Sequence, residues 1–519
     1  MPTATRLLIL VLSFCLFVVT AAGARALKST RAQTIERVVH LAPFGTNGSR
    51  YVYVPFGVPR GAVRVTVSYA YERAGGENTI DIGVFDARSS GSDTDPRGFR
   101  GWSGGRRSEF FISRDEATPG YLPGALPAGT WRVILGLYKV APAGVDVSFK
   151  IVVETEEGKA GGSASRRARV SPGAAAPEGD AAEYRRQRRL IIEYFKPGLR
   201  WWRGDLHTHT VHSDGDWTVP GLVDGAGEAG LDFIFVTDHN TSSHHAEIAR
   251  AGKDPRPPLV LRGEEITTYG GHTNAWGLPA GAWVDFRVRP GDSARMSEVA
   301  ARAHRLGALV SVNHPFALCG GCAWSYGGAL KDFDAVEVWN GEWDPTDESA
   351  LEMWDEALQR GLRLTAVASS DSHRPQNPVG RPTTHVGAGV LSQAALLAAI
   401  RRGRAYLTAE PGRPLVRFEA WARGGGQAAR SLPGDEIRLG APGTLLLFVT
   451  VRDAPPDSSV LLISNGRAIR NAPAGPDGEL RKFEVECERD GYYRLEVRDR
   501  TGAMLALTNP IYVKVRAKR

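Results

Sequence analysis

Residues 233–239 of this chain read FIFVTDH. The four apolar residues of this stretch are typical of a short strand buried on both faces of a parallel sheet, and residues of metal-ligand type follow at once. The same order recurs where the largely apolar run 308–312 precedes His314. A β/α barrel collects the side chains at the C-terminal ends of its strands in one active site. The repeated order therefore predicts such a site.

Ligand-type residues recur in this way along the whole middle of the chain. Between about residues 196 and 410, strand-like runs alternate with helix-like runs at 219–229, 296–306, 350–360 and 393–402. Such alternation indicates an α/β fold with a parallel sheet, open or closed. The candidate ligands that follow these strand-like runs, or a Gly-Gly pair in the case of His272, are His207, His209, His239, Glu265, His272, His314, Asp371 and His373.

The pair His207 and His209 has a spacing that suits metal binding. On an extended segment, residues i and i+2 point to one face, and two neutral imidazoles there form a natural half-site for zinc, manganese or iron. Asp371 and His373 repeat this spacing, and the two oxygens of Glu265 can bridge two metals. A single histidine would more often be structural. Ligand-type residues at five strand ends instead predict one multinuclear metal site.

The motifs of this region resemble those of the PHP family, named after polymerase and histidinol phosphatase. The resemblance covers about residues 202–408. Its motifs are, in order, GDLHTHT at 204–210, SDG at 213–215, VTDH at 236–239, RGEE at 262–265, NHP at 313–315 and SSDSH at 369–373. Two further motifs, VEVWNG at 336–341 and GRAYLT at 403–408, are similar to the CehA/McbA subgroup of metallohydrolases.

This resemblance implies a distorted (β/α)7 barrel of PHP type with two or three divalent metal ions, which would be zinc, manganese or iron. The implied ligands are His207, His209, Glu265 and Asp371 for a first metal, Glu265, His272 and His314 for a second, and His239 and His373, helped by Asp214, for a third. Trinuclear members often have a histidine near the position of Gly215. The chain departs from that pattern, and Asp214 is the neighbouring candidate.

The resemblance also implies a reaction, in which a metal-activated hydroxide attacks phosphorus or a carbonyl carbon. Asp238 could protonate the leaving group, or it could only orient a ligand histidine. Arg374, Asn240 and Asn340 are candidates for substrate contact. The planar guanidinium of Arg374 suits phosphate, and a surface salt bridge is the alternative role.

We therefore expect a metal-dependent hydrolase that acts on a small molecule, first of all an anionic phosphate mono- or diester. A carbamate, ester or amide hydrolase is the first alternative, because ligand identity does not report the electrophile. The second alternative is an inactive barrel that serves as a scaffold, with the flanking β-domains binding the cell envelope or a glycan.

The regions on either side of the barrel have a different pattern. Short strand-like runs with frequent turns occupy residues 38–155 and 411–519, and each region is predicted to form a β-sandwich domain. Residues 156–195 are predicted to be a linker rich in Gly, Ala, Ser, Pro and Arg, followed by a lead-in helix. At 519 residues, two or three domains are the number expected from length.

The start of the chain predicts export. Arg6 precedes the apolar run 7–20, and small residues follow at 22–24, so residues 1–24 are typical of a secretory signal peptide. An uncleaved anchor is the alternative. Since no other segment could cross a bilayer, we expect a periplasmic or extracellular protein. In that setting Cys319 and Cys322 are predicted to form a local disulfide, with two free thiols as the alternative.

The net charge of the chain adds little to the prediction of its function. The net charge is +7, and part of it lies in local runs such as residues 185–189. A basic balance can steer an anionic substrate. No stripe of basic residues is interleaved with aromatic ones, so we expect no nucleic-acid polymer as a partner.

Overall fold

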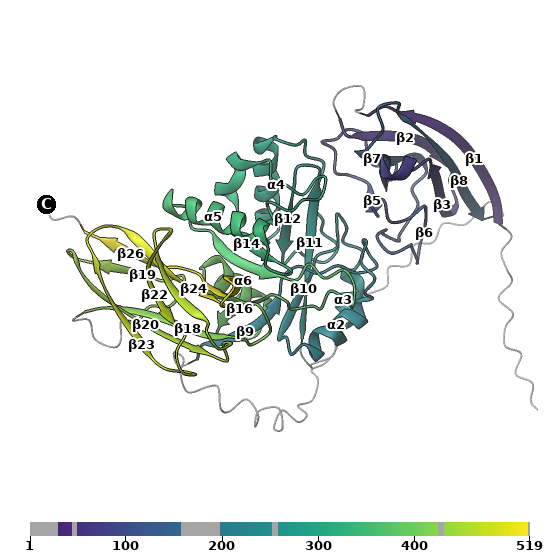
Figure 1. The fold of residues 1–519 in the computed structure, drawn as a ribbon. Helices are drawn as coiled ribbons and strands as arrows, with labels where there is room; N and C mark the ends of the chain where they lie inside the picture. Colours follow the sequence, from purple (N-terminus) through teal and green to yellow (C-terminus); the bar gives the residue numbers. More distant parts are fainter. Residues whose placement is uncertain (1–29, 44–48, 157–197, 252–257, 424–429, 517–519) are drawn as a thin grey trace, which may run out of the picture.

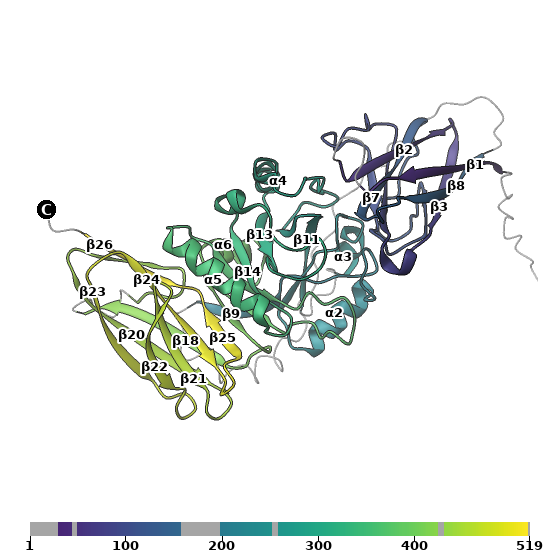
Figure 2. The same ribbon diagram turned by 45° about the horizontal axis from the view of Figure 1, so that its top comes forward.

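The computed structural model describes residues 30–43, 49–156, 198–251, 258–423 and 430–516. The predicted signal peptide, and nearly all of the predicted linker and lead-in helix, lie outside these ranges. Figures 1 and 2 show three parts in a row, with N-terminal strands at one end, a mixed middle part and C-terminal strands at the other end. None of the helices in the described ranges is long and apolar enough to span a membrane.

The N-terminal part consists of two antiparallel sheets that share one hydrophobic core. Across the first sheet the strands are β1 (Thr30–Leu41), β8 (Val145–Glu156), β3 (Ala62–Tyr71) and β6 (Glu109–Ser113). Across the second they are β2 (Tyr51–Val58), β7 (Gly129–Lys139), β4 (Thr79–Phe85) and β5 (Phe99–Trp102); a short 3-10 helix, η1 (Ala74–Gly76), precedes β4. Successive side chains of a strand point to opposite faces. Accordingly Val65 and Val67 of β3 and Ile80 and Ile82 of β4 are fully buried.

The middle part is a mixed sheet with helices packed on it. Its strands, in order across the sheet, are β15 (Thr365–Ser369), β14 (Ala335–Asn340), β13 (Leu309–Asn313), β12 (Gly271–Trp276), β11 (Leu259–Thr268), β10 (Phe233–Val236), β9 (Arg200–Asp205), β16 (Thr383–Ala388) and β17 (Ala405–Thr408). The helices are α2 (Val219–Glu228), α3 (His245–Ala251), α4 (Ser293–Arg305), α5 (Pro345–Gln359), α6 (Gln393–Arg401) and the 3-10 helix η4 (Gly327–Asp332).

The α/β class is as expected, but the closed (β/α)7 barrel is not what the structure shows. β9, β10 and β11 pair in parallel, and so do β13, β14 and β15, whereas β12 is antiparallel to both of its neighbours. A hairpin such as β11–β12 needs no crossover helix, which is one reason why the middle part has few helices.

Backbone pairing within the described residues also leaves the sheet open between β15 and β16. The hydroxyl of Thr384 spans this gap: it accepts a hydrogen bond from the N–H of Ala368 at 2.9 Å and donates one to the Ala368 carbonyl at 2.7 Å. The buried strands β15 and β16 are thus joined by a side chain instead of by backbone hydrogen bonds. The sheet curves far enough to bring its edge strand β15 against β16, without closing into a barrel.

The C-terminal part is continuous with the middle sheet. Its separate three-stranded sheet consists of β18 (Leu415–Ala422), β20 (Gly443–Arg452) and β23 (Arg481–Cys487). The strands that extend the middle sheet are β25 (Met504–Thr508), β24 (Gly491–Arg498), β21 (Ser459–Ser464), β22 (Arg467–Pro473), β26 (Ile511–Val515) and β19 (Glu436–Leu439). The connection is the pairing of β17 with β25, where Leu407 lies opposite Leu507. The buried Arg494 of β24 also pairs with Asp355 of α5.

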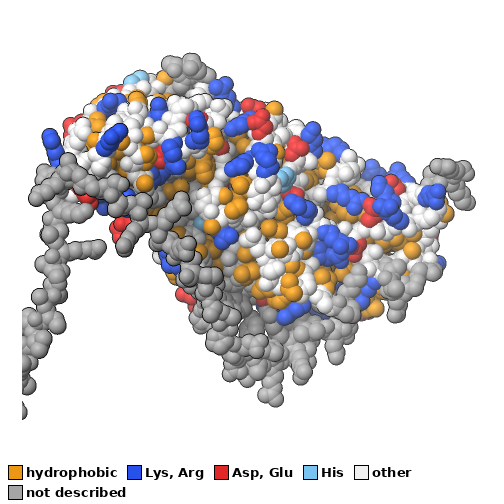
Figure 3. Space-filling model, turned by 180° about the vertical axis from the view of Figure 1, so that it is seen from behind, with side chains coloured by type: hydrophobic (Ala, Val, Ile, Leu, Met, Phe, Trp, Pro, Cys, Tyr) orange, Lys and Arg blue, Asp and Glu red, His pale blue; other side chains and the backbone are white. Residues whose placement is uncertain are grey.

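The charged residues of the surface are dispersed on the face seen in Figure 3. There Lys and Arg side chains lie among apolar and acidic ones over all three parts of the molecule. Many surface cations of the described residues belong to local pairs, for example Arg106 with Asp216 at 2.6 Å and Arg423 with Glu484 at 2.7 Å. Exposed pairs of this kind contribute little stability.

Candidate metal centre

Glu265, in the second half of β11, is the residue around which the predicted ligands gather. Its side chain is fully buried. The ring nitrogens nearest to Oε1 belong to His207 at 3.2 Å, His272 at 3.3 Å and His314 at 3.3 Å, and those nearest to Oε2 belong to His239 at 2.7 Å and His209 at 3.6 Å. One carboxylate therefore lies among five histidines that come from four segments of the chain.

The first group comprises His207, His209, Glu265 and Asp371. His207 and His209 follow β9 directly, and Asp371 follows β15 in a left-handed conformation with φ of 51°. Oδ1 of Asp371 lies 3.0 Å from Nε2 of His209 and 3.4 Å from Nε2 of His207. The implied ligands of the first metal are thus brought together.

The ends of β9 and β15 are held against each other by a buried carboxylate, Asp205. It accepts hydrogen bonds from the backbone N–H groups of Gly380 at 2.7 Å and Ser370 at 3.2 Å, and it pairs with the Ser370 hydroxyl. Burial raises the pKa of Asp205 to about 6, despite these hydrogen bonds. Asp205 therefore fixes the position of His207 relative to Asp371 without joining the ligands.

The second group comprises Glu265, His272 and His314. His272 lies on β12, opposite Thr267 of β11 and Asn313 of β13, so the ladder itself sets its position. His314 follows β13 with φ of 25°, and this turn directs its ring toward Glu265. The Gly-Gly pair before His272 thus leads into a strand, and the strand pairing holds the residue beside Glu265.

The third group comprises Asp214, His239 and His373. Oδ1 of Asp214 lies 3.3 Å from Nε2 of His373 and 3.4 Å from Nε2 of His239. A side chain at Gly215 is excluded, because a Cβ there would lie 2.7 Å from the backbone carbonyl of His209. The backbone at Gly215 thus leaves no room for a side chain, and the carboxylate of this group comes from Asp214.

The three groups fit a metal ion because several of their buried polar atoms have no hydrogen-bond partner among the described residues. Among the described residues, buried atoms without a hydrogen-bond partner include Nε2 of His207, Nε2 of His209, Nδ1 of His272 and Oδ1 of Asp371. A buried polar atom without a partner is costly. All four atoms point into the cluster around Glu265, where a cation would satisfy them.

Burial disfavours charge throughout the cluster, and charged neighbours either add to its effect on the pKa of a group or outweigh it. Burial lowers the pKa of His209 to about 4, and the nearby His373 and His239 add to this effect. Burial also acts on His239, but Asp214 and Glu265 outweigh it and raise the pKa to about 9. Burial raises the pKa of Glu265, yet His207 and the other histidines hold it well below its usual value. An ionised Glu265 and a neutral His209 are the forms that bind metal.

The two predicted catalytic residues lie outside the ligand cluster. Asp238 is fully buried and accepts hydrogen bonds from Thr210 N–H and from the hydroxyls of Thr210 and Ser213, each at 2.7 Å. Ser213 Oγ in turn lies 3.4 Å from Nδ1 of His209. This position supports the orienting role for Asp238 over proton donation. Arg374 is exposed on the loop that follows His373.

The two asparagines predicted to contact substrate have structural hydrogen bonds. Asn240 accepts from Thr267 N–H at 2.8 Å and donates to the Thr267 carbonyl at 3.0 Å, which ties the end of β10 to β11. Asn340 donates to Glu337 at 3.0 Å and to Asp371 at 3.5 Å. Both amides therefore support the ligands.

Two residues of the site were missed as candidates. Glu337 of β14 is 1% exposed and lies 3.2 Å from Nδ1 of His207. Asn313 donates to Oε1 of Glu265 at 3.1 Å. The signal for Glu337 was present in the sequence, since a carboxylate inside the apolar run 335–339 has to find a buried partner.

The N-terminal sheets form one wall beside the centre. Tyr269, just after β11, donates to Asp81 of β4 at 2.7 Å. Burial raises the pKa of Asp81 to about 7, partly offset by Tyr269 and His239. A cavity of about 500 Å³ lies elsewhere, between β9 and the C-terminal strands, and none of the predicted ligands lines it.

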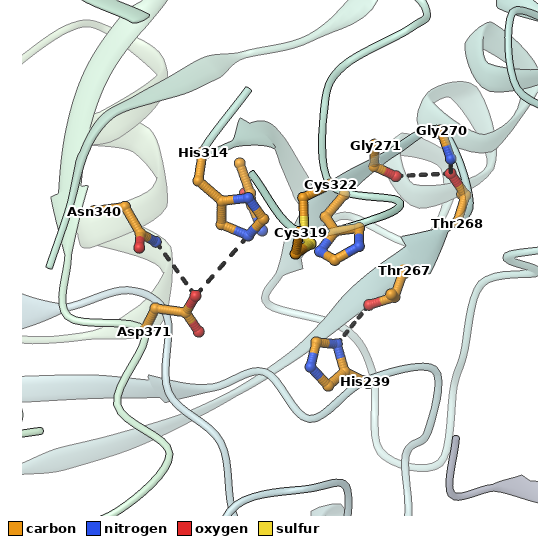
Figure 4. The surroundings of a disulfide bond; sticks show 12 residues. His239, Thr267, Thr268, Gly270, Gly271, His314, Cys319, Cys322, Asn340 and Asp371 are labelled. Atoms are coloured by element: carbon orange, nitrogen blue, oxygen red, sulfur yellow. Dashed lines mark hydrogen bonds and ion pairs between the residues drawn. A yellow bond between two sulfur atoms is a disulfide. The ribbon is translucent and has the colours of Figure 1, made fainter. Parts of the chain in front are cut away.

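A disulfide lies directly beside the second group. Cys319 and Cys322 are joined, as the sequence predicted, in the loop between β13 and η4. Figure 4 shows this disulfide next to His314, with Asp371 and His239 nearby. Ligand atoms of His272, His314 and Cys322 all lie within 4.8 Å of one another.

Comparison with known proteins gives matches in structure only. No family model matches the chain, and no curated protein matches it. A two-domain protein from Bacteroides vulgatus, named as containing a PHP-like metal-dependent phosphoesterase, is similar over 60% of this chain and 96% of its own, with 19% identity and a TM-score of 0.36. A protein from Bifidobacterium adolescentis named as a metal-dependent phosphoesterase covers 34% of this chain and 90% of its own, with 19% identity and a TM-score of 0.27.

A third similar structure is an amidohydrolase from Chromobacterium violaceum with bound sulfate and no metal. It covers 40% of this chain and 98% of its own, with 16% identity and a TM-score of 0.27. The name of the first structure mentions PHP, that of the second does not, and neither names the CehA/McbA subgroup.

Proposed function

We propose that this protein is an exported metal-dependent hydrolase that cleaves phosphate mono- or diesters of small molecules. The observation that carries the proposal is the convergence of nine side chains, from several strands and the loops that follow them, into three groups around the buried carboxylate of Glu265. Sites with two or more metals are typical of phosphatases and nucleases, and they also occur in aminopeptidases.

The residues that would hold zinc, manganese or iron are those of the three groups, with Glu265 shared by the first and second. When bound, such ions lower the pKa of water and stabilise negative charge that develops on the substrate. The remaining roles belong to the chain itself. Glu337 orients His207, and Asp238 orients His209 through Ser213. Arg374 lies on the loop after His373, where its guanidinium could receive an anionic ester.

The scaffold is, in this proposal, an opened form of the PHP barrel. Three observations support it: the parallel runs β9–β11 and β13–β15, the placement of ligands at strand ends, and the bridging of β15 to β16 by Thr384. The antiparallel β12 replaces one strand–helix unit. Because His272 lies on β12, the strand that departs from a regular barrel carries one of the proposed ligands.

Export to the periplasm or the extracellular space is the proposed location. Two features support it, the signal-type composition of residues 1–24 and the disulfide between Cys319 and Cys322. Disulfides persist in oxidising compartments. We also propose that the flanking β-strand regions contact the envelope or a glycan, a role compatible with their position at the two ends of the molecule (Figure 1).

The test is a substrate panel measured with metal-reconstituted protein. Aryl phosphates and phosphodiesters are compared with aryl carbamates, esters and amides. We expect phosphate ester hydrolysis by the wild type and by His304→Ala, a histidine of α4 outside the centre, and none by His209→Ala. Turnover of carbamates or amides alone would replace the phosphoesterase assignment. A protein that binds no metal and turns over no substrate would support the scaffold alternative.

A further inference from the structure

The disulfide next to the second group has two unequal ends. Cys322 is 6% exposed and faces His272 and His314, whereas Cys319 lies at the surface of the same loop. Leu318, its neighbour, is 95% exposed. A reductant therefore reaches one sulfur of the bond, while the other sulfur lies among metal ligands.

Backbone hydrogen bonds fix this loop against the ligand strand. Gly271 N–H donates to the Gly321 carbonyl at 2.9 Å, and Ser325 N–H donates to the Gly270 carbonyl at 2.8 Å. Gly271 has φ of 132°, and a Cβ on it would lie 2.8 Å from the Trp324 ring. The loop is thus seated directly on the residue that precedes His272. Its close approach requires a residue without a Cβ at position 271.

His272 is a second, independent indication that a metal ion binds beside Cys322. It is 8% exposed, and its Nδ1 has no hydrogen-bond partner among the described residues. Nδ1 of His314 is likewise buried without a partner. Glu265, His272 and His314 give a metal three protein ligands, which is one fewer than a closed tetrahedral zinc site has.

We propose that Cys322 is a latent metal ligand: reduction of the Cys319–Cys322 disulfide releases a sulfur that binds the ion held by His272 and His314. The inference rests on the proposed metal centre and extends it to redox control. In the oxidised protein the second group keeps an open position for substrate. In the reduced protein the sulfur fills that position, so that reduction turns hydrolysis down.

The distances allow this change with a small movement. A tetrahedral zinc ion with sulfur at about 2.3 Å and nitrogen at about 2.0 Å requires ligand atoms roughly 3.5 Å apart. The ligand atoms of His272, His314 and Cys322 lie within 4.8 Å of one another while the disulfide still restrains Cys322. Rotation of a freed cysteine side chain about its Cα–Cβ bond covers the difference.

The reaction balances with a dithiol as reductant. A thiolate of the reductant attacks Sγ of Cys319, the disulfide breaks, and Sγ of Cys322 leaves with the electron pair. The second thiol of the reductant then displaces Cys319. The reductant becomes a disulfide, the two cysteines gain two electrons and two protons, and the proton on Cys322 passes to water when the sulfur binds the metal.

The experiment is spectroscopic and uses the full mature chain loaded with cobalt or zinc. The protein is compared before and after reduction with a phosphine, which takes oxygen from water and adds no sulfur ligand. We expect visible cobalt bands in both states and a sulfur-to-cobalt charge-transfer band only after reduction. With zinc, X-ray absorption should gain a Zn–S distance of about 2.3 Å in the reduced protein.

Three variants separate the possible outcomes. Cys319→Ser should show the sulfur band without any reductant, and Cys322→Ser, which lacks the same disulfide, should never show it. Cys487→Ser, a buried cysteine of β23, should behave as the wild type. Cobalt bands without a sulfur band in reduced wild type and in Cys319→Ser would overturn the latent ligand and leave the proposed function intact. A sulfur band that persists in Cys322→Ser would overturn the assignment to Cys322. No cobalt bands in any form would reject the metal centre itself.

Discussion

Oε1 of Glu337 lies 3.2 Å from Nδ1 of His207, and Nε2 of the same ring lies 3.2 Å from Oε1 of Glu265. One imidazole thus spans two buried carboxylates. If its Nδ1 carries the proton and donates to Glu337, Nε2 is left as a lone-pair donor toward the first group. A carboxylate behind a ligand histidine fixes the ring and makes it a better metal ligand.

The first prediction is that Glu337→Gln weakens metal binding by about 10- to 100-fold, the range found when such supporting residues are removed. The amide keeps the shape of the side chain and loses its charge. Metal titration measures the affinity, and Glu342→Gln, an exposed residue of the following loop, is the matched control. Equal affinities in both variants would show that Glu337 does not support the ligand.

The second prediction concerns Asp214, which lies 3.3 Å from His373 and 3.4 Å from His239. Asp214→Ala should lose one equivalent of metal and keep the remainder, because the first and second groups do not use this carboxylate. The control is Asp216→Ala, which removes only a surface pair with Arg106. An unchanged metal content in Asp214→Ala would argue against a third ion.

The third prediction tests the steric account of Gly215. Gly215→Ala places a Cβ 2.7 Å from the His209 carbonyl, so His209 and Asp214 have to move. We expect unfolding free energy to fall by about 1–3 kcal/mol and metal binding to weaken. Gly327→Ala, at a position with nothing within 4 Å, should change neither quantity. Chemical denaturation and metal titration of both variants provide the comparison.

The fourth prediction is a dependence of stability on pH that arises away from the metal centre. His385 of β16 is 1% exposed, bonds to Thr408 at 2.9 Å and stacks on Tyr406. Burial, with a smaller effect from Arg203, lowers its pKa to about 3. In the unfolded chain the pKa is about 6.5, so the unfolded state takes up the proton first as the pH falls.

Because the unfolded chain takes up this proton at a higher pH than the folded chain, the free energy of unfolding decreases as the pH falls. The contribution of His385 to stability is complete above pH about 6.5 and is lost toward pH 3, at about 1.4 kcal/mol per pH unit. Urea unfolding of metal-free protein between pH 7 and 4 should therefore show a shallower pH slope for His385→Gln than for the wild type. The exposed His40→Gln serves as control. Identical slopes in all three proteins would contradict the prediction.

The grouping of most candidate ligands could be predicted from the sequence, because most of them lie shortly after a short apolar run. The structure brings all nine predicted metal ligands together, His207 with Asp371 and Asp214 with His373 among them. Parallel strands end at one edge of a sheet, so residues at their ends meet whatever the details of the connections.

The rest depends on features that no pattern of periodicity reveals. β12 is a short strand whose direction is set by pairing, and its antiparallel course removed the regular barrel. His314 and Asp371 reach the centre through left-handed backbone conformations, with φ of 25° and 51°. The hydrogen bonds that Asp238 accepts from Thr210 and Ser213 arise from tertiary contacts. The approach of Cys322 to His272 arises from a loop seated on Gly271, which is a tertiary contact.

The most direct measurement is the metal content per chain, by elemental analysis of protein purified without added metal, for the wild type and for Glu265→Gln. Glu265 is shared by the first and second groups and contacts histidines of all three. The account predicts about two to three equivalents of zinc, manganese or iron in the wild type and at most one in Glu265→Gln. A wild type that binds no metal even after reconstitution, or a full complement in Glu265→Gln, would contradict it.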